Sequence, residues 1–185
     1  MNLAQRLAAT LSIALLLHSF AADAADPDWT ITVDKRGSTF IVDAHLDFAA
    51  PLRTAWEVFT DFDHMTAILS NLTASRIVSR TANTLVVQQE GLARYGFFSY
   101  PFTSEREIRL EPMKRIVARQ LSGNARSFSS ELQLSPGGNG TEVRYHAEMV
   151  PDSGIARTFG GPFIRHEIEE QFNAMAAEMT RRKAL

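Results

Sequence analysis

The chain contains no cysteine, which excludes disulfide bonds, zinc–thiolate sites and cysteine nucleophiles. It also lacks a strong charge of either sign, since 19 Lys and Arg residues stand against 21 Asp and Glu residues. Proteins that bind nucleic acid carry a marked excess of Lys and Arg, so this balance argues against nucleic acid as a partner. Without disulfides, the fold must be stabilised by packing.

Motifs of common catalytic and cofactor-binding classes are missing as well. The chain has no Gly-x-Ser-x-Gly turn, no phosphate-binding Gly-x-x-x-x-Gly-Lys pattern and no pair of histidines at the i, i+4 spacing of a zinc helix. We therefore expect no metal, no cofactor and no catalytic residue, and interpret each histidine as a surface or hydrogen-bonded residue. The five histidines are scattered through the chain: His18, His45, His64, His146 and His166.

Carboxylates gather at two places, and both have structural interpretations. Asp61 and Asp63 are typical of a helix end and the turn after it. Glu167, Glu169 and Glu170 suit the N-terminal half of a helix, where the helix dipole favours negative charge.

The N-terminus is predicted to be an export signal. Arg6 supplies the positive charge, residues 7–20 are largely apolar, and Ala-Asp-Ala at 22–24 is a small-x-small cleavage site. The alternative is an uncleaved membrane anchor, but polar residues interrupt the stretch, which is shorter than the roughly 20 apolar residues of a spanning helix. We expect export, to the bacterial periplasm, of a chain that begins near Ala25. The predicted divisions are a signal peptide at 1–24, an N-terminal extension at 25–35 and one domain at 36–185.

The sequence pattern of the remaining chain predicts short strands followed by one long helix. Residues 39–48 alternate between apolar and polar side chains, which predicts a strand with one buried face. Pro51 opens a helical piece, and a second short turn follows Asp63. Six closely spaced strands come next, and their spacing leaves no room for crossover helices, so neighbours should pair antiparallel. These strands are predicted at Ala74–Arg80, Thr84–Leu92, Phe102–Glu111, Arg115–Ser122, Ser127–Leu134 and Thr141–Met149.

The long helix is predicted to begin at Gly160 and Gly161, with Pro162 in its first turn. Its apolar residues recur at three- and four-residue steps and form an apolar stripe, which is expected to pack against another element of the fold. The predicted fold is therefore α+β, with two short helices after the first strand, a seven-stranded curved antiparallel sheet and a long C-terminal helix. The stripe consists of Ile164, Ile168, Phe172, Met175 and Met179.

Several short strings, together with the order of elements, resemble the START-like (SRPBCC) superfamily, and within it the polyketide cyclase/dehydrase and coenzyme Q-binding lipid-transport group. The resemblance covers about residues 36–183. It implies a helix-grip fold, in which the curved sheet wraps the C-terminal helix around a hydrophobic ligand cavity. None of the strings is a catalytic motif. They are Ala50-Pro51-Leu52, Ala55-Trp56, Thr60-Asp61-Phe62-Asp63, Ser75-Arg76, Ser79-Arg80, Gly140-Thr141 and Glu178-Met179-Thr180-Arg181-Arg182.

The segment 93–102 is unusually rich in aromatic residues for a connection between two strands. One interpretation is that the rings plug the end of the curved sheet. The other is a portal or lid that contacts an apolar ligand or, transiently, a membrane surface. Arg94 and Arg106 flank the segment and could meet phosphate or carboxylate head groups. The aromatic residues are Tyr95, Phe97, Phe98, Tyr100 and Phe102.

The function predicted from the sequence is binding or transport of a hydrophobic small molecule or lipid, including an isoprenoid quinone, in the cavity between sheet and helix. The inward faces of the later strands would supply apolar walls with a few polar groups, although an ordinary core has the same pattern. The predicted cavity or portal residues are Tyr95, Phe97, Phe98, Tyr100, Phe102, Phe128, Tyr145, Ile168, Phe172 and Met175.

Two alternatives from other classes stay open at this stage. A cyclase, aromatase or dehydratase would need polar groups in the cavity, and Tyr145, His146 and Glu148 are the first candidates, although alternation lets only one face of their strand see the cavity. A protein-interaction module would instead need an exposed functional patch and a small, empty cavity.

Overall fold

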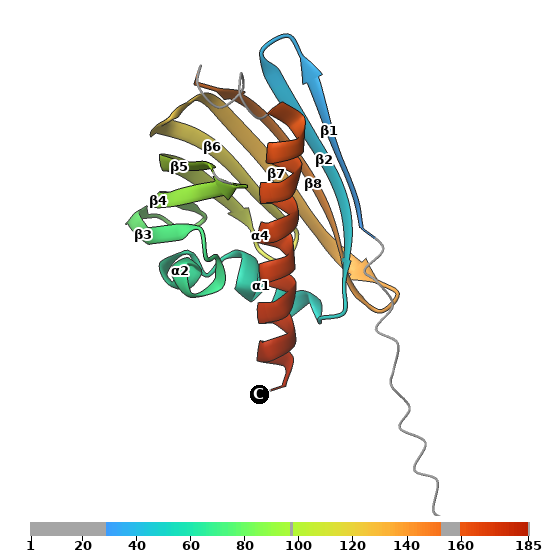
Figure 1. Ribbon diagram of the computed structural model, residues 1–185. Coiled ribbons are helices and arrows are strands. Elements are labelled where there is room, and N and C mark those ends of the chain that lie inside the picture. The colour runs from blue at the N-terminus through green and yellow to red at the C-terminus, as the bar shows by residue number, and fades with distance from the viewer. Residues whose placement is uncertain (1–28, 97, 153–159, 185) are drawn as a thin grey trace, which may run out of the picture.

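The computed structural model describes residues 29–96, 98–152 and 160–184. One antiparallel sheet curves around the long helix α4 (Gly160–Lys183), which lies across its concave face (Figure 1). The strand order is β1-β2-β8-β7-β6-β5-β4-β3. The strands are β1 (Thr30–Arg36), β2 (Thr39–Phe48), β3 (Leu72–Arg80), β4 (Thr84–Tyr95), β5 (Phe98–Glu111), β6 (Arg115–Gly123), β7 (Ala125–Gly137) and β8 (Gly140–Pro151).

The α+β fold and the antiparallel meander predicted from the sequence are confirmed. β2 has the predicted bounds, and its apolar residues are buried at alternate positions, as the period of two requires. β8 behaves in the same way, since Val143 and Ala147 are buried while Arg144 and His146 face solvent. One face of the sheet therefore meets α4 and the other meets water.

The sheet has eight strands, and the prediction of seven is wrong. The missed strand, β1, lies almost wholly within the segment predicted to be an N-terminal extension, and it pairs with β2 along its whole length. It is an edge strand in which Ile31 is buried, while Asp34, Lys35 and Arg36 are exposed. Charged residues are common on edge strands and hide the alternation that would identify a strand.

The aromatic segment is a continuation of two strands instead of a loop between them. β4 runs to Tyr95 and β5 begins at Phe98, so the hairpin turn is short and contains Gly96 at φ +59°. Pro101 lies within β5 opposite Leu92. Proline is tolerated there because β5 pairs with β6 only from Ser104 onward, which leaves the proline without a strand on its other side.

The two predicted short helices follow β2, namely α1 (Leu52–Phe59) and α2 (Met65–Ile68), and a 3-10 turn, η1 (Phe62–His64), lies between them. Asp61 and Asp63 lie in the turn after α1, as predicted, and their carboxylates contact distant parts of the chain. Asp63 Oδ1 accepts a hydrogen bond from the Ile77 backbone N–H at 2.8 Å. Asp61 Oδ2 accepts one from Arg182 at 2.6 Å.

The predicted apolar stripe of α4 packs on the sheet and on α1. Ile164, Phe172 and Met179 are buried, and the other two stripe residues are partly buried against the core. The Phe172 ring packs edge-on against Phe59, with centroids 6.3 Å apart. In the part of the chain that the structure describes, no helix combines the length and apolar character needed to cross a membrane.

Candidate functional site

The space between α4 and the concave face of the sheet contains a cavity in two parts. The wider chamber, of about 260 Å³, extends from the β4–β5 hairpin to the start of α4. Its walls include Leu72, Phe102, Phe128, Ala147 and Ile164, so they are predominantly apolar. Apolar walls with a few placed polar groups are typical of sites for small organic ligands.

The narrower chamber, of about 130 Å³, lies next to α1 and α2. Most of the side chains that line it are apolar, among them Phe59, Ile108, Leu132, Phe172 and Met175. Phenylalanine and the flexible methionine can adapt their packing to an apolar guest. Arg106 is the one charged side chain among the described residues that line this chamber.

Four polar side chains line both chambers and so lie where the two meet: Gln89 on β4, Arg106 on β5, Tyr145 on β8 and Gln171 on α4. Three of them point inward because their strand positions alternate with outward ones. This polar junction, as we call these four residues, is the one part of the wall shared by the two chambers that can recognise a polar ligand group.

Arg106 is the charged member of the polar junction. Its Nη2 donates a hydrogen bond to Gln89 Oε1, and its guanidinium lies 5.7 Å from the centroid of the Phe128 ring. The buried Nε has no hydrogen-bond partner in the described part of the chain. Burial lowers the pKa of Arg106, because the charged form loses its hydration. An arginine remains charged even so.

Gln89 is held in one orientation by a chain of hydrogen bonds. Its Nε2 donates to Ser75 Oγ at 3.1 Å, and Ser75 Oγ donates to the Phe62 carbonyl at 2.6 Å. Since the amide nitrogen is used in this way, the amide oxygen faces Arg106. Gln89 therefore positions the guanidinium.

Tyr145 brings a phenol to the same junction. Its ring packs edge-on against Phe172, with centroids 5.4 Å apart. Burial raises the pKa of Tyr145, while the charge of Arg106 and a hydrogen bond with Ser130 oppose the shift. The phenol therefore keeps its proton and can donate a hydrogen bond into the cavity.

Glu167 lies in the N-terminal half of α4, as interpreted from the sequence, and it also lines the wall of the wider chamber. Only 9% of the residue is exposed, and Oε2 accepts a hydrogen bond from Asn71 Nδ2 at 3.1 Å. Oε1 is buried and has no partner within the described residues. Burial raises the pKa of Glu167, and the bond from Asn71 opposes the rise. Nothing in the sequence marks Asn71 or Glu167 as a cavity residue.

The structure brings together seven of the ten residues predicted for the cavity or portal. The wider chamber contains Tyr100, Phe102 and Phe128, the narrower one contains Phe172 and Met175, and Tyr145 and Ile168 line both. Tyr95 and Phe98 pair with each other at the hairpin end, and their side chains are outside the description. Phe97 lies outside the described residues. A role of any of the ten in ligand binding remains a prediction.

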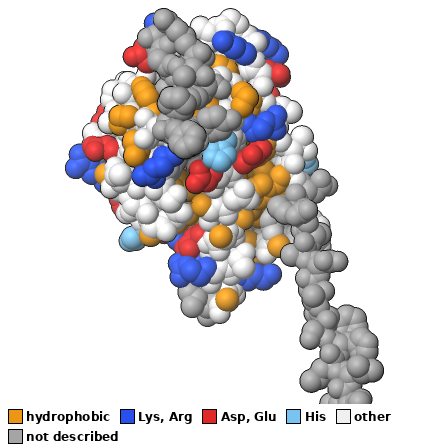
Figure 2. Space-filling model, in the orientation of Figure 1, with side chains coloured by type: hydrophobic (Ala, Val, Ile, Leu, Met, Phe, Trp, Pro, Cys, Tyr) orange, Lys and Arg blue, Asp and Glu red, His pale blue; other side chains and the backbone are white. Residues whose placement is uncertain are grey.

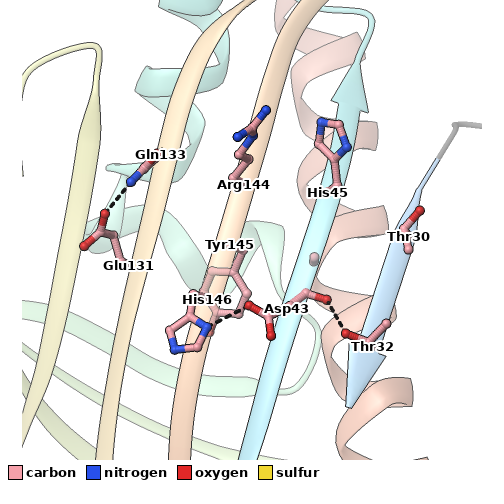
Figure 3. A pocket seen from close by; sticks show the side chains of 10 residues that line it. Thr30, Thr32, Asp43, His45, Glu131, Gln133, Arg144, Tyr145 and His146 are labelled. Carbon is pink, nitrogen blue, oxygen red and sulfur yellow. Dashed lines mark hydrogen bonds and ion pairs between the residues drawn. The ribbon is translucent and has the colours of Figure 1, made fainter. Parts of the chain in front are cut away.

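The outer face of the sheet has a hollow of about 590 Å³ with quite different walls. Figure 3 shows its side chains, which come from β1, β2, β7 and β8. Their ionisable groups pair across the strands: His146 Nδ1 lies 2.7 Å from Asp43, and His45 Nε2 lies 2.9 Å from Glu142. The bond from His45 is the main cause that lowers the pKa of Glu142. This hollow does not suit an apolar ligand.

The three residues of β8 considered as candidates for catalysis point to opposite faces of the sheet. Tyr145 lines the cavity, whereas His146 and Glu148 lie on the outer face, with His146 Nε2 3.8 Å from Glu148. The three residues therefore cannot act on one substrate in the cavity. No group of three or more His, Cys, Asp or Glu residues suited to a metal ion occurs in the described ranges 29–96, 98–152 and 160–184.

Charged groups of both signs are interspersed with apolar ones on the face of the molecule that α4 crosses (Figure 2). No large patch of one charge covers this face, as the small net charge of −2 leads one to expect. It offers no extended basic surface of the kind that nucleic acid requires.

The fold is shared with known START-like proteins. The Zhui aromatase/cyclase from Streptomyces sp. R1128 is 19% identical, with a TM-score of 0.68 over 78% of this chain and 95% of that one. A STAR-related lipid transfer protein from Xanthomonas axonopodis is 10% identical, with a TM-score of 0.60 over 82% and 98%. A START superfamily protein from Mycobacterium smegmatis is 13% identical, with a TM-score of 0.57 over 77% and 95%. At these identities the likeness defines the fold alone.

The chain thus has the fold of these proteins, a helix-grip architecture in which the curved sheet wraps a long C-terminal helix. A family model described as polyketide cyclase / dehydrase and lipid transport matches residues 39–182. The chain belongs to this family, as the resemblance seen in its sequence implied. A comparison with curated proteins gives no match.

Proposed function

We propose that this protein binds and carries a hydrophobic ligand, a lipid or isoprenoid quinone, in the two-chamber cavity between sheet and α4. The observation that carries the proposal is the composition of the walls, which are predominantly apolar in both chambers. Besides the polar junction and the Asn71–Glu167 pair, the polar lining consists of Thr103, Ser104, Gln120, Asn124 and Asp152 in the wider chamber and Ser130 in the narrower one. Transfer of apolar ligand surface from water into such walls yields roughly 25 cal/mol for each Å² buried. No covalent step is required.

The test is mass spectrometry of an organic extract from the protein purified without detergent. A stoichiometric lipid or quinone, missing from an unrelated protein prepared in parallel, is the expected result and would identify the cargo. A protein that is empty and also fails to take up added lipids or quinones would contradict the proposal.

Export to the periplasm is part of the same proposal. It is supported by the charged start, apolar stretch and small-residue cleavage site within residues 1–24. Cell fractionation should find the protein in the periplasmic fraction, and its N-terminal sequence should begin near Ala25. A chain that keeps residues 1–24 and fractionates with the cytoplasm would overturn this part.

An enzyme of the cyclase or dehydratase type is a second candidate, which Glu167 favours. A buried carboxyl group with a raised pKa in a cavity wall is a typical proton donor or acceptor. The compound extracted from the protein can decide between the two functions. Incubated with fresh protein, a cargo keeps its mass, whereas a substrate is converted, for example with loss of water.

A further inference from the structure

We propose that the ligand carries a carboxylate head group, which the Arg106 guanidinium binds at the junction of the two chambers. This inference deepens the proposed function and rests on it. It assigns the cavity a definite class of cargo, an amphipathic acid with an apolar chain and one negative charge.

The first argument is charge. Arg106 brings one positive charge into the cavity wall, and no Asp or Glu of the described residues forms an ion pair with it; its contacts are the neutral Gln89 amide and the Phe128 ring. Removal of an ion from water without a counter-charge is strongly unfavourable. A ligand with a negative charge would offset this cost, whereas a neutral one would not.

The second argument is hydrogen bonding. Arg106 Nε is buried and has no acceptor among the described residues, although nearly all buried polar groups in proteins have one. Gln89 occupies one Nη2 hydrogen and is itself fixed through Ser75, so it cannot turn to serve Nε. A carboxylate oxygen is the acceptor that a guanidinium binds best.

The third argument is position. The Tyr145 phenol lines the same junction and can donate a second hydrogen bond to the carboxylate. The walls beyond it in the narrower chamber are apolar apart from Ser130, so they suit the chain of the ligand and not its head. Glu167 is on the wall of the wider chamber alone, whereas Arg106 also lines the narrower chamber.

The experiment is isothermal titration calorimetry of the purified protein with three probes of the same chain length: dodecanoate, methyl dodecanoate and dodecan-1-ol. At neutral pH, dodecanoate should bind about tenfold or more tightly than either neutral probe, because a hydrogen bond to a charged group is stronger than one to a neutral group. Equal affinity for the three probes would overturn the carboxylate inference and leave the proposed function intact. Failure of all three to bind would overturn the carboxylate inference, and the proposed function falls with it if the organic extract of the protein is empty and added quinones also fail to bind.

Substitutions locate the effect. Arg106→Gln should lower the affinity for dodecanoate about tenfold or more and that for dodecan-1-ol by a much smaller factor; the binding of dodecan-1-ol that remains shows that the cavity is intact. The matched control is Arg109→Gln on the same strand, since that side chain is 69% exposed and pairs with Glu107 on the surface. Arg106→Lys keeps the charge and should retain part of the preference. A dodecanoate preference that survives Arg106→Gln would contradict the inference; should that variant not fold, the wild-type comparison decides.

Discussion

Arg182, near the end of α4, forms an ion pair of 2.6 Å with Asp61, 121 residues earlier in the chain. Arg182 also donates to Glu178 at 2.6 Å, and His64 Nδ1 lies 2.6 Å from Asp61. The cluster joins the C-terminal end of α4 to the connection between α1 and η1. It fixes the C-terminal end of the helix against this connection.

Removal of the ion pair between Arg182 and Asp61 should destabilise the fold. We expect Arg182→Gln to lower the free energy of unfolding by about 1–2 kcal/mol, since the pair is partly buried and its loss leaves Asp61 with a weaker partner. The control is Arg181→Gln, because Arg181 is exposed and bonds to Glu178 alone in the described contacts. Urea unfolding measures both variants. Equal losses in the two would show that the link to Asp61 contributes nothing.

Acid should weaken the same cluster. Hydrogen bonds from Arg181, and then from Arg182, lower the pKa of Glu178 to about 2, against burial, which raises it. Because the folded pKa lies below the unfolded value of 4.5, the stabilisation is present above 4.5 and is lost as the pH falls toward 2. Urea midpoints measured across this range should fall more steeply for the wild type than for Glu178→Gln. Parallel curves would contradict the prediction.

Glu167 should make the fold less stable as the pH rises, which is the opposite of the pH dependence that Glu178 causes. Burial raises its pKa, so the folded state holds its proton more tightly than the unfolded chain does, and stability falls as the pH rises above 4.5. Glu167→Gln should therefore unfold at higher urea concentrations than the wild type at neutral pH, with the difference shrinking at pH 4. A variant that is less stable at neutral pH would mean that the carboxylate is needed for its bond to Asn71.

Gly140 should tolerate no side chain. A Cβ there would lie 2.2 Å from the Phe48 carbonyl oxygen and 2.8 Å from the Ala50 nitrogen, both rigid backbone atoms. We expect Gly140→Ala to cost about 3 kcal/mol or more, measured by urea unfolding. Gly138→Ala, two residues away, is the matched control because a Cβ there meets nothing within 4 Å. Similar stabilities of the two variants would refute this account.

A large side chain in the cavity wall should exclude the ligand. Ala147 is 3% exposed and lines the wider chamber, so the ring of Ala147→Phe would occupy space that a ligand needs. We expect the variant to fold but to bind dodecan-1-ol at least about tenfold more weakly. Ala177→Phe, on the exposed side of α4, adds the same ring elsewhere and should bind normally. Undiminished binding by Ala147→Phe would place the ligand elsewhere.

Periodicity was sufficient to predict most of the fold. The strands from β2 to β8 bury one face, and so their alternation is visible in the sequence, as it is for Val143 to Ala147. β1 could not be predicted in this way, because it is an edge strand with few buried positions and its residues Asp34, Lys35 and Arg36 are exposed. Pro101 concealed the start of β5, since a local rule about proline cannot reveal that the other side of the strand is unpaired.

The apolar walls of the site could be predicted from the same alternation, but its polar groups could not. The sequence marks Arg106 and Glu167 as charged residues, and nothing local shows that either is buried. Their burial depends on which residues of β4, β5 and α4 face one another. Asn71 is a further example, because its partner Glu167 is 96 residues away.

The two outermost strands of the sheet are engaged by side chains at their open sides. Arg165 of α4 donates to the Ile31 carbonyl of β1, and Asp63 accepts from the Ile77 N–H of β3. Backbone groups on an unpaired strand otherwise serve as a template for a strand from another chain. A second copy that approached either edge would first have to displace these side chains, so the fold resists edge-to-edge aggregation while its sheet remains open.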